Sequence, residues 1–181
     1  MQHHHHMTPV QAYGPRRRSW RGDDEPGGSV GLGTIHVVAA SVALGLGLVV
    51  MARSKGDAWH VRLGRLYMAA MLAVAVPVLF VYDITGGPGV FHALAVVSLL
   101  TTSLGWLSVL RRGWSREGVV AHATFMAWSW TGVVTAGLAQ LANHQWPDES
   151  PWPVLVVVGM ATLAGAIVVP PFVSRALPVR R

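Results

Sequence analysis

Cysteine is absent from this chain of 181 residues, and carboxylates and charges in general are scarce. The absence of cysteine excludes disulfides, thiolate metal sites and cysteine nucleophiles, and it leaves histidine as the only soft nitrogen ligand. Charged residues make up 12% of the chain, whereas soluble domains have about 25%. Hydrophobic residues make up 52%, and the mean hydropathy is +0.44. This composition excludes an ordinary soluble domain and predicts an integral membrane protein.

The basic residues outnumber the acidic ones, with 14 lysines and arginines against 8 aspartates and glutamates and a formal net charge of +6. In a soluble domain this excess would suggest nucleic acid or another anionic partner. Here the charges cluster between apolar runs, so we interpret them as topology signals and expect membrane lipid, not nucleic acid, as a partner. The opening MQHHHHM resembles an expression tag, so its histidines are set aside.

Five apolar runs are each close to the ~20 residues that a helix needs to cross a ~30 Å hydrocarbon core. They cover residues 31–52, 60–82, 89–110, 118–142 and 153–173. Because the connections are short, consecutive helices should be antiparallel neighbours. We therefore predict an all-α integral membrane protein with five transmembrane helices, of which the first four form an up-and-down bundle and the fifth is peripheral. Pro170 and Pro171 should end the fifth helix.

The chain divides into three parts on this basis. Residues 1–30 are the tag and a disordered tail with an arginine cluster of unassigned role, residues 31–142 are the four-helix core, and residues 143–181 hold an outer loop, the fifth helix and a basic tail. Loops 53–59 and 111–117 carry positive charge, so both should face the cytoplasm. Tryptophans at the edges of the runs fit an interfacial aromatic belt: Trp59, Trp114, Trp146 and Trp152.

Four histidines mark the starts of the first four runs. His36, His60, His92 and His122 each lie within the first turn or two of a different run. Alternating topology places His36 and His92 at one level near the outer face, and His60 and His122 at one level near the inner face. Each pair belongs to diagonally opposed helices, whose side chains project into a common core. Two imidazoles that face each other at one depth are the geometry for axial ligation of a haem iron, so the sequence predicts two bis-histidine sites.

Small side chains follow two of these histidines, where a flat macrocycle would need space. Gly64 stands one turn after His60. The helical face that carries His36 continues with Ala40, Ala43 and Gly47.

Basic side chains lie near the inner pair. Arginine recognises carboxylates bidentately, so the inner haem propionates have candidate partners in Arg62, Arg65 and Arg111. His144 has no partner histidine, and we interpret it as a polar loop residue, with a reductant site near the outer haem as the alternative.

One histidine stands near the start of each of four successive segments: TIHVVAAS, WHVRLGRLY, FHALAVVSLL and AHATFMAWSW. This arrangement resembles the dihaem four-helix core of the cytochrome b561 superfamily and covers about residues 31–142. The resemblance implies that His36 and His92 hold one haem b and that His60 and His122 hold the other.

The same resemblance implies transmembrane electron transfer by a membrane haem oxidoreductase. The reductant would be quinol, ascorbate or superoxide, and a homodimer or a partner redox subunit would fit such a role. No ascorbate-binding motif is present, so the electron donor and acceptor stay open. The segment HVRLGRLYMAAML is also similar to an uncharacterised family of prokaryotic predicted membrane proteins, which implies a bacterial cytoplasmic membrane.

Two interpretations from other classes stay open. In one, the histidines bind a transition-metal ion or relay protons in a small transporter that holds no haem. In the other, they only cap helices in a non-catalytic membrane assembly subunit.

Overall fold

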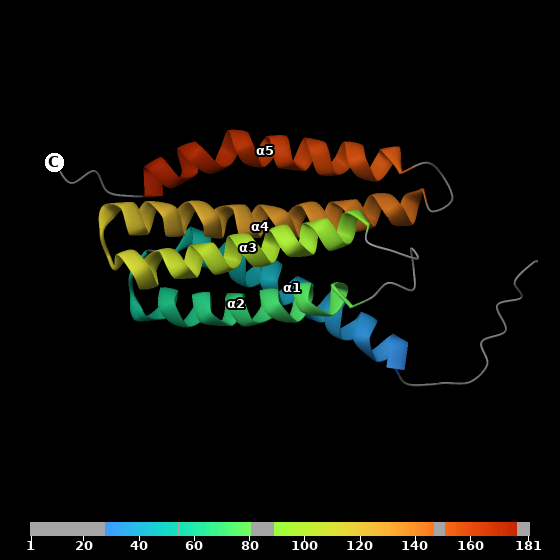
Figure 1. Ribbon diagram of the computed structural model, residues 1–181, viewed down its shortest axis with the longest axis horizontal. Coiled ribbons are helices and arrows are strands. Elements are labelled where there is room, and N and C mark those ends of the chain that lie inside the picture. The colour runs from blue at the N-terminus through green and yellow to red at the C-terminus, as the bar shows by residue number, and fades with distance from the viewer. Residues whose placement is uncertain (1–27, 54, 81–88, 147–150, 177–181) are drawn as a thin grey trace, which may run out of the picture.

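The computed structural model describes residues 28–53, 55–80, 89–146 and 151–176. These residues form helices and short connections, with no strand among them (Figure 1). The helices are α1 (Gly28–Ala52), α2 (Ala58–Val78), α3 (Val90–Arg112), α4 (Arg116–Gln145) and α5 (Trp152–Ala176). The all-α prediction is confirmed, and each helix coincides with one apolar run to within a few residues. The tag and the N-terminal arginine cluster lie outside the described residues.

Four of the helices contain a segment long and apolar enough to cross a membrane: α1 from Thr34 to Ala52, α2, α3 and α5 from Trp152 to Arg175. This confirms the prediction of an integral membrane protein. α4 is the longest helix, with 30 residues, but it is less apolar. Glu117 lies in its first turn, Ser129 in its middle and His144 in its last turn.

Side chains in the connections determine where α2 and α4 begin. Asp57 accepts a hydrogen bond from the backbone N–H of His60 at 2.6 Å, and Ser115 accepts one from the N–H of Gly118 at 3.2 Å. Both are N-caps, which satisfy N–H groups that have no partner inside the helix. Gly113 has a positive φ of 59°, a conformation that favours glycine, and turns the chain between α3 and α4.

The first four helices close into a ring, with α5 outside it. Helices that follow one another along the chain pack together, and α1 also packs against α4. Within the described part of the chain, the diagonal pairs α1 with α3 and α2 with α4 make no close backbone contact. α5 lies along α4 on the side away from α1 and α2 (Figure 1). The histidine-bearing helices are thus paired diagonally, as the bundle prediction requires.

The core is made of small and medium side chains that let the helices approach closely. Ala43, Tyr67, Met71 and Val133 form one buried cluster between α1, α2 and α4. Gly47 lies beside this cluster, and the indole of Trp130 fills the space that a side chain at Gly47 would occupy. Ala43 and Gly47, two of the small residues that follow His36, therefore serve close packing of protein side chains.

Two predicted boundaries differ from the structure. α1 begins at Gly28, inside the stretch assigned to the tail. Pro170 and Pro171 do not end α5, which continues to Ala176. That prediction was wrong because packing holds the helix across the prolines: Val169 and Val173 are 4% and 6% exposed and join a second buried cluster against α4.

Candidate functional site

The lysines and arginines of the described residues all lie toward one end of the bundle, where α1 meets α2, α3 meets α4 and α5 ends (Figure 1). We call it the basic end, and it is formed by Arg53, Lys55, Arg62, Arg65, Arg111, Arg112, Arg116 and Arg175. Asp57 and Glu117 are the only carboxylates in the described part of the chain, and they lie here too. The basic end thus contains both loops, 53–59 and 111–117, that the sequence assigned to one side of the membrane.

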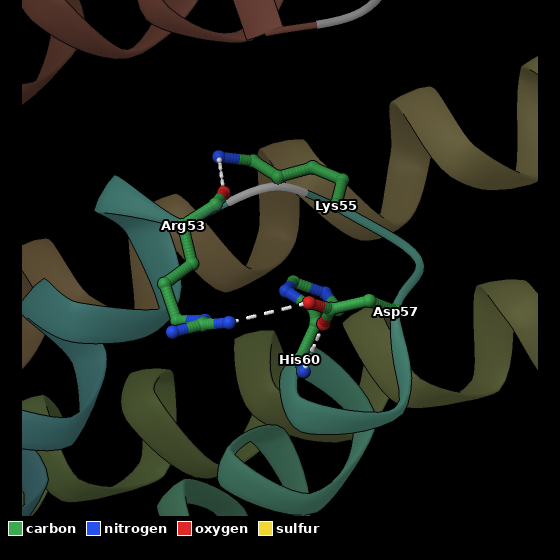
Figure 2. Close-up of polar contacts among 4 residues, drawn as sticks. All are labelled: Arg53, Lys55, Asp57 and His60. Atoms are coloured by element: carbon green, nitrogen blue, oxygen red, sulfur yellow. Dashed lines mark hydrogen bonds and ion pairs between the residues drawn. The ribbon is translucent and has the colours of Figure 1, made fainter.

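His60 is held at the start of α2 by the loop that precedes it. Its backbone N–H donates to the carboxylate of Asp57. The same carboxylate accepts a hydrogen bond from the guanidinium of Arg53 at 3.3 Å (Figure 2). The Nδ1 atom of His60 is buried and has no hydrogen-bond partner among the described residues. Buried polar atoms are nearly always paired, so a bound ligand would supply the partner that this nitrogen lacks among the described residues.

Charged groups of the loop titrate away from their usual pKa. The hydrogen bond from the His60 N–H, and then the guanidinium of Arg53, lower the pKa of Asp57. Partial burial lowers the pKa of Lys55, whose ammonium donates to the carbonyl oxygens of Met51 and Arg53 at 2.6 and 3.2 Å. Lys55, which follows α1 in the chain, therefore binds carbonyl oxygens at the C-terminal end of that helix.

His122 carries a hydrogen bond that fixes its tautomer. Its Nδ1 lies 2.9 Å from the carbonyl oxygen of Gly105 in α3. A carbonyl only accepts, so Nδ1 carries the proton in the neutral ring and Nε2 presents its lone pair. Metal-bound histidines typically have this arrangement, because the outer hydrogen bond orients the ring and raises the basicity of the ligating nitrogen. Close approach of α4 at Gly105 makes the bond possible, since a side chain there would meet Sδ of Met126 at 2.8 Å.

His60 and His122 belong to α2 and α4, which are diagonal in the ring of helices, and both lie toward the basic end of the bundle. Gly64 shares the face of α2 that carries His60, and a methyl group added there would meet no atom within 4 Å. Among the described residues, the face of α2 is therefore open at this position.

The three arginines predicted to pair with propionates are all exposed. The guanidinium carbon of Arg62 lies 5.7 Å from the ring centre of Trp59, over its face. Arg111 lines a groove between α3 and α4. All three belong to the same end of the bundle as the inner histidine pair.

The outer pair is arranged differently. His36 is half-buried in the third turn of α1, while His92 lies in the first turn of α3. Nδ1 of His92 accepts a hydrogen bond from the backbone N–H of Gly89 at 3.2 Å. In the neutral ring, Nε2 of His92 then carries the proton, which is the opposite tautomer to that of His122. Of these two histidines, His122 therefore presents Nε2 as a lone pair, whereas His92 presents it protonated.

A chain of hydroxyl groups crosses the middle of the bundle, and the sequence analysis missed it. Tyr67 and Thr102 lie 2.8 and 2.7 Å from the same atom, Oγ of Ser129. Thr102 donates its one proton to the carbonyl oxygen of Ser98, so the protons must run from Tyr67 to Ser129 to Thr102 to Ser98. The hydroxyl residues spaced four apart in α3 were the available signal. This chain separates the levels of the two histidine pairs.

No group of three or more His, Asp or Glu side chains that could hold a metal ion is found in the ranges that the structure describes. His144 is exposed in the last turn of α4, at the end opposite the basic end. The sequence analysis interpreted it as a polar loop residue, whereas the structure places it within the last turn of the helix.

Comparison with known proteins gives one match. A family described as a predicted membrane protein (DUF2306) matches residues 33–174, which include all four core histidines and both loops of the basic end. No curated protein and no solved structure matches the chain. The likeness of the histidine segments to the cytochrome b561 core stays a prediction.

Proposed function

The chain belongs to the DUF2306 family of predicted membrane proteins, and from this premise we propose that it is a five-span cytochrome b that transfers electrons across a membrane. In this proposal α4 spans the bilayer together with the four apolar helices. Its polar side chains, such as Ser129, then face the bundle interior and not lipid.

The observation that carries the proposal is the state of the inner histidine pair. His122 presents the Nε2 lone pair with its Nδ1–H held by Gly105, and His60 holds a buried ring nitrogen without a partner among the described residues. One turn after His60 on α2, a methyl group added at Gly64 would meet no atom within 4 Å. These features fit a planar metal cofactor bound between α2 and α4.

When bound, haem b would supply one-electron redox chemistry, and the protein would set its position and environment. His60 and His122 would hold the inner haem, with Arg62 and Arg65 available to the propionates, whereas Arg111 lines the groove on α3 and α4. His36 and His92 would hold the outer one. His92 would first have to release the N–H of Gly89, because Nδ1 now accepts from it.

The proposed orientation places the basic end in the bacterial cytoplasm. A small reductant, namely quinol, ascorbate or superoxide, would be oxidised on one face and an acceptor reduced on the other. The hydroxyl chain at Ser129 closes the inner site toward the middle of the membrane, so it keeps the two haem levels apart.

A reduced-minus-oxidised absorption spectrum tests the proposal. Protein purified after expression with ample haem should be red, and dithionite should produce the split bands of low-spin haem b. A colourless preparation would refute it. A bound transition metal without a haem spectrum in the same sample would favour the transporter interpretation.

Single substitutions test the pairing. His60→Ala and His122→Ala should each remove about one haem equivalent and leave the outer haem in place. His144→Ala, at the far end of α4, is the matched control and should keep the full content. Unchanged haem in His60→Ala would contradict the proposed ligand set.

A further inference from the structure

A groove on the flank of α3 and α4 combines an apolar wall with a basic rim. Its volume is about 260 Å³, and its apolar wall includes Leu104, Leu107 and Phe125. Arg111 and Arg112 line it at the basic end, where α3 finishes. The groove therefore changes from apolar to cationic along the helix axis, which in this chain is the direction across the membrane.

Part of the groove faces outward from the bundle. Leu104 is 42% exposed, and both arginines are exposed. Arg111 lies about a third of a turn round α3 from Gly105, which faces α4 and His122. A molecule in the groove would thus approach from the lipid and not from the interior of the bundle.

The cationic rim lacks a protein anion. No carboxylate is among the residues that line the groove. The one ion pair seen in the described ranges joins Arg53 to Asp57, in a different loop. Ser108 also lines the groove, but its hydroxyl already donates to the carbonyl oxygen of Leu104 at 2.6 Å. The guanidinium groups are therefore the donors available to an incoming anion.

We propose that this groove binds one anionic phospholipid from the bilayer. The lipid phosphate pairs with Arg111 and Arg112, and an acyl chain lies along Leu104, Leu107 and Phe125. Arginine suits a phosphate because its planar fork presents parallel donors. Basic clefts between membrane helices at the headgroup level bind anionic lipids for the same reason. This lipid site does not depend on haem. Arg62 and Arg65, the arginines near the inner histidines, do not line the groove.

The test uses the full chain in nanodiscs of phosphatidylcholine with graded phosphatidylglycerol, and native mass spectrometry counts the phosphatidylglycerol retained. The double variant Arg111→Gln/Arg112→Gln should weaken retention about 25-fold, because each basic residue near the surface contributes about fivefold. The matched control Arg116→Gln/Arg175→Gln removes the same charge from the basic end but outside the groove. An equal loss in both double variants would overturn the proposal, because it would show only a general surface potential.

A second variant tests the apolar wall. Ala121 lines the groove on α4, and Ala121→Phe should fill it and lower retention while both arginines stay in place. Its melting temperature in pure phosphatidylcholine should match that of the original chain, which separates blocking from misfolding. Inorganic phosphate at the same phosphate concentration should not displace the lipid. Retention that is unchanged in Ala121→Phe, or abolished by inorganic phosphate, would exclude a lipid site.

Discussion

A single carboxylate, Asp57, links the stability of the start of α2 to pH. The His60 N–H and the Arg53 guanidinium both favour its charged form in the folded protein, so its pKa is lower there than in the unfolded chain. The stabilisation is therefore complete above the ordinary value of 3.8 and is lost as the pH falls through the lower folded value.

We expect the melting temperature in detergent to fall more steeply with acid for the original chain than for Asp57→Asn. Asparagine also caps helices but does not titrate, so the variant keeps the hydrogen bond and loses this part of the pH dependence. The measurement is a series of melting curves from neutral pH to below pH ~3.8. Identical acid profiles for the two proteins would show that Asp57 does not contribute.

Ser129 is the residue on which the buried hydroxyl chain depends. Ser129→Ala would remove the acceptor of Tyr67 and the donor to Thr102 at once, whereas Tyr67→Phe leaves Ser129 still donating to Thr102. We expect Ser129→Ala to cost about 1–3 kcal/mol of unfolding free energy and Tyr67→Phe less. Denaturant unfolding in micelles measures both, with the exposed Ser103→Ala as the control. A larger loss in Tyr67→Phe would contradict the proton order derived above.

The sequence placed one histidine near the start of each of the first four helices and treated the four as equivalent, but His36 lies in the third turn because α1 begins at Gly28. His122 and His92 differ in the direction of the hydrogen bond that each ring makes. His122 donates to the carbonyl oxygen of Gly105, whereas His92 accepts from the N–H of Gly89. Whether a ring nitrogen donates or accepts depends on which backbone group lies opposite it. For His122 that group is the carbonyl oxygen of Gly105, 17 positions earlier in the chain. Hydrophobic periodicity does not predict a contact between residues so far apart.

At the scale of helices, Gly47 sets how closely α1 approaches α4. Trp130 inserts its indole over Gly47 and donates from Nε1 to the carbonyl oxygen of Leu44 at 3.1 Å. Gly47→Ala would collide with the indole and break this bond, so we expect a loss of about 1–3 kcal/mol, as in overpacked cores. Gly45→Ala is the control, because a methyl group there meets nothing within 4 Å.

Tryptophan fluorescence during thermal unfolding reports both glycine variants. A shift in the summed tryptophan emission of the folded protein, together with a lower melting temperature, is expected for Gly47→Ala alone. Equal stability of the two variants would show that the crossing of α1 and α4 is adaptable.

The helices themselves were largely predictable from the sequence. Apolar runs of membrane-crossing length and short charged connections gave five helices and their antiparallel order. The ends were less predictable, because they depend on local partners. α5 continues past Pro171 because Val173 packs against α4, which is a contact between helices and not a property of the α5 sequence.

At the scale of the whole molecule, α4 decides the number of membrane crossings. The four apolar helices alone meet the composition expected of a span, and α4 does not. α4 nevertheless packs against α1, α3 and α5 along a helix of 30 residues. A helix surrounded in this way can carry polar side chains through a bilayer because they face protein and not lipid.

The topology can be tested because the chain has no cysteine of its own. Trp114→Cys places a thiol at the basic end before α4, and His144→Cys places one at the other end, both at exposed positions. If α4 spans the membrane with the basic end inside, a membrane-impermeant maleimide should label His144→Cys in intact cells and Trp114→Cys only after lysis. Labelling of both from outside would mean that α4 does not cross, because its two ends would then share a side. Labelling of Trp114→Cys alone would keep the five spans but reverse the orientation, and the arginine groove would then lie in the outer leaflet.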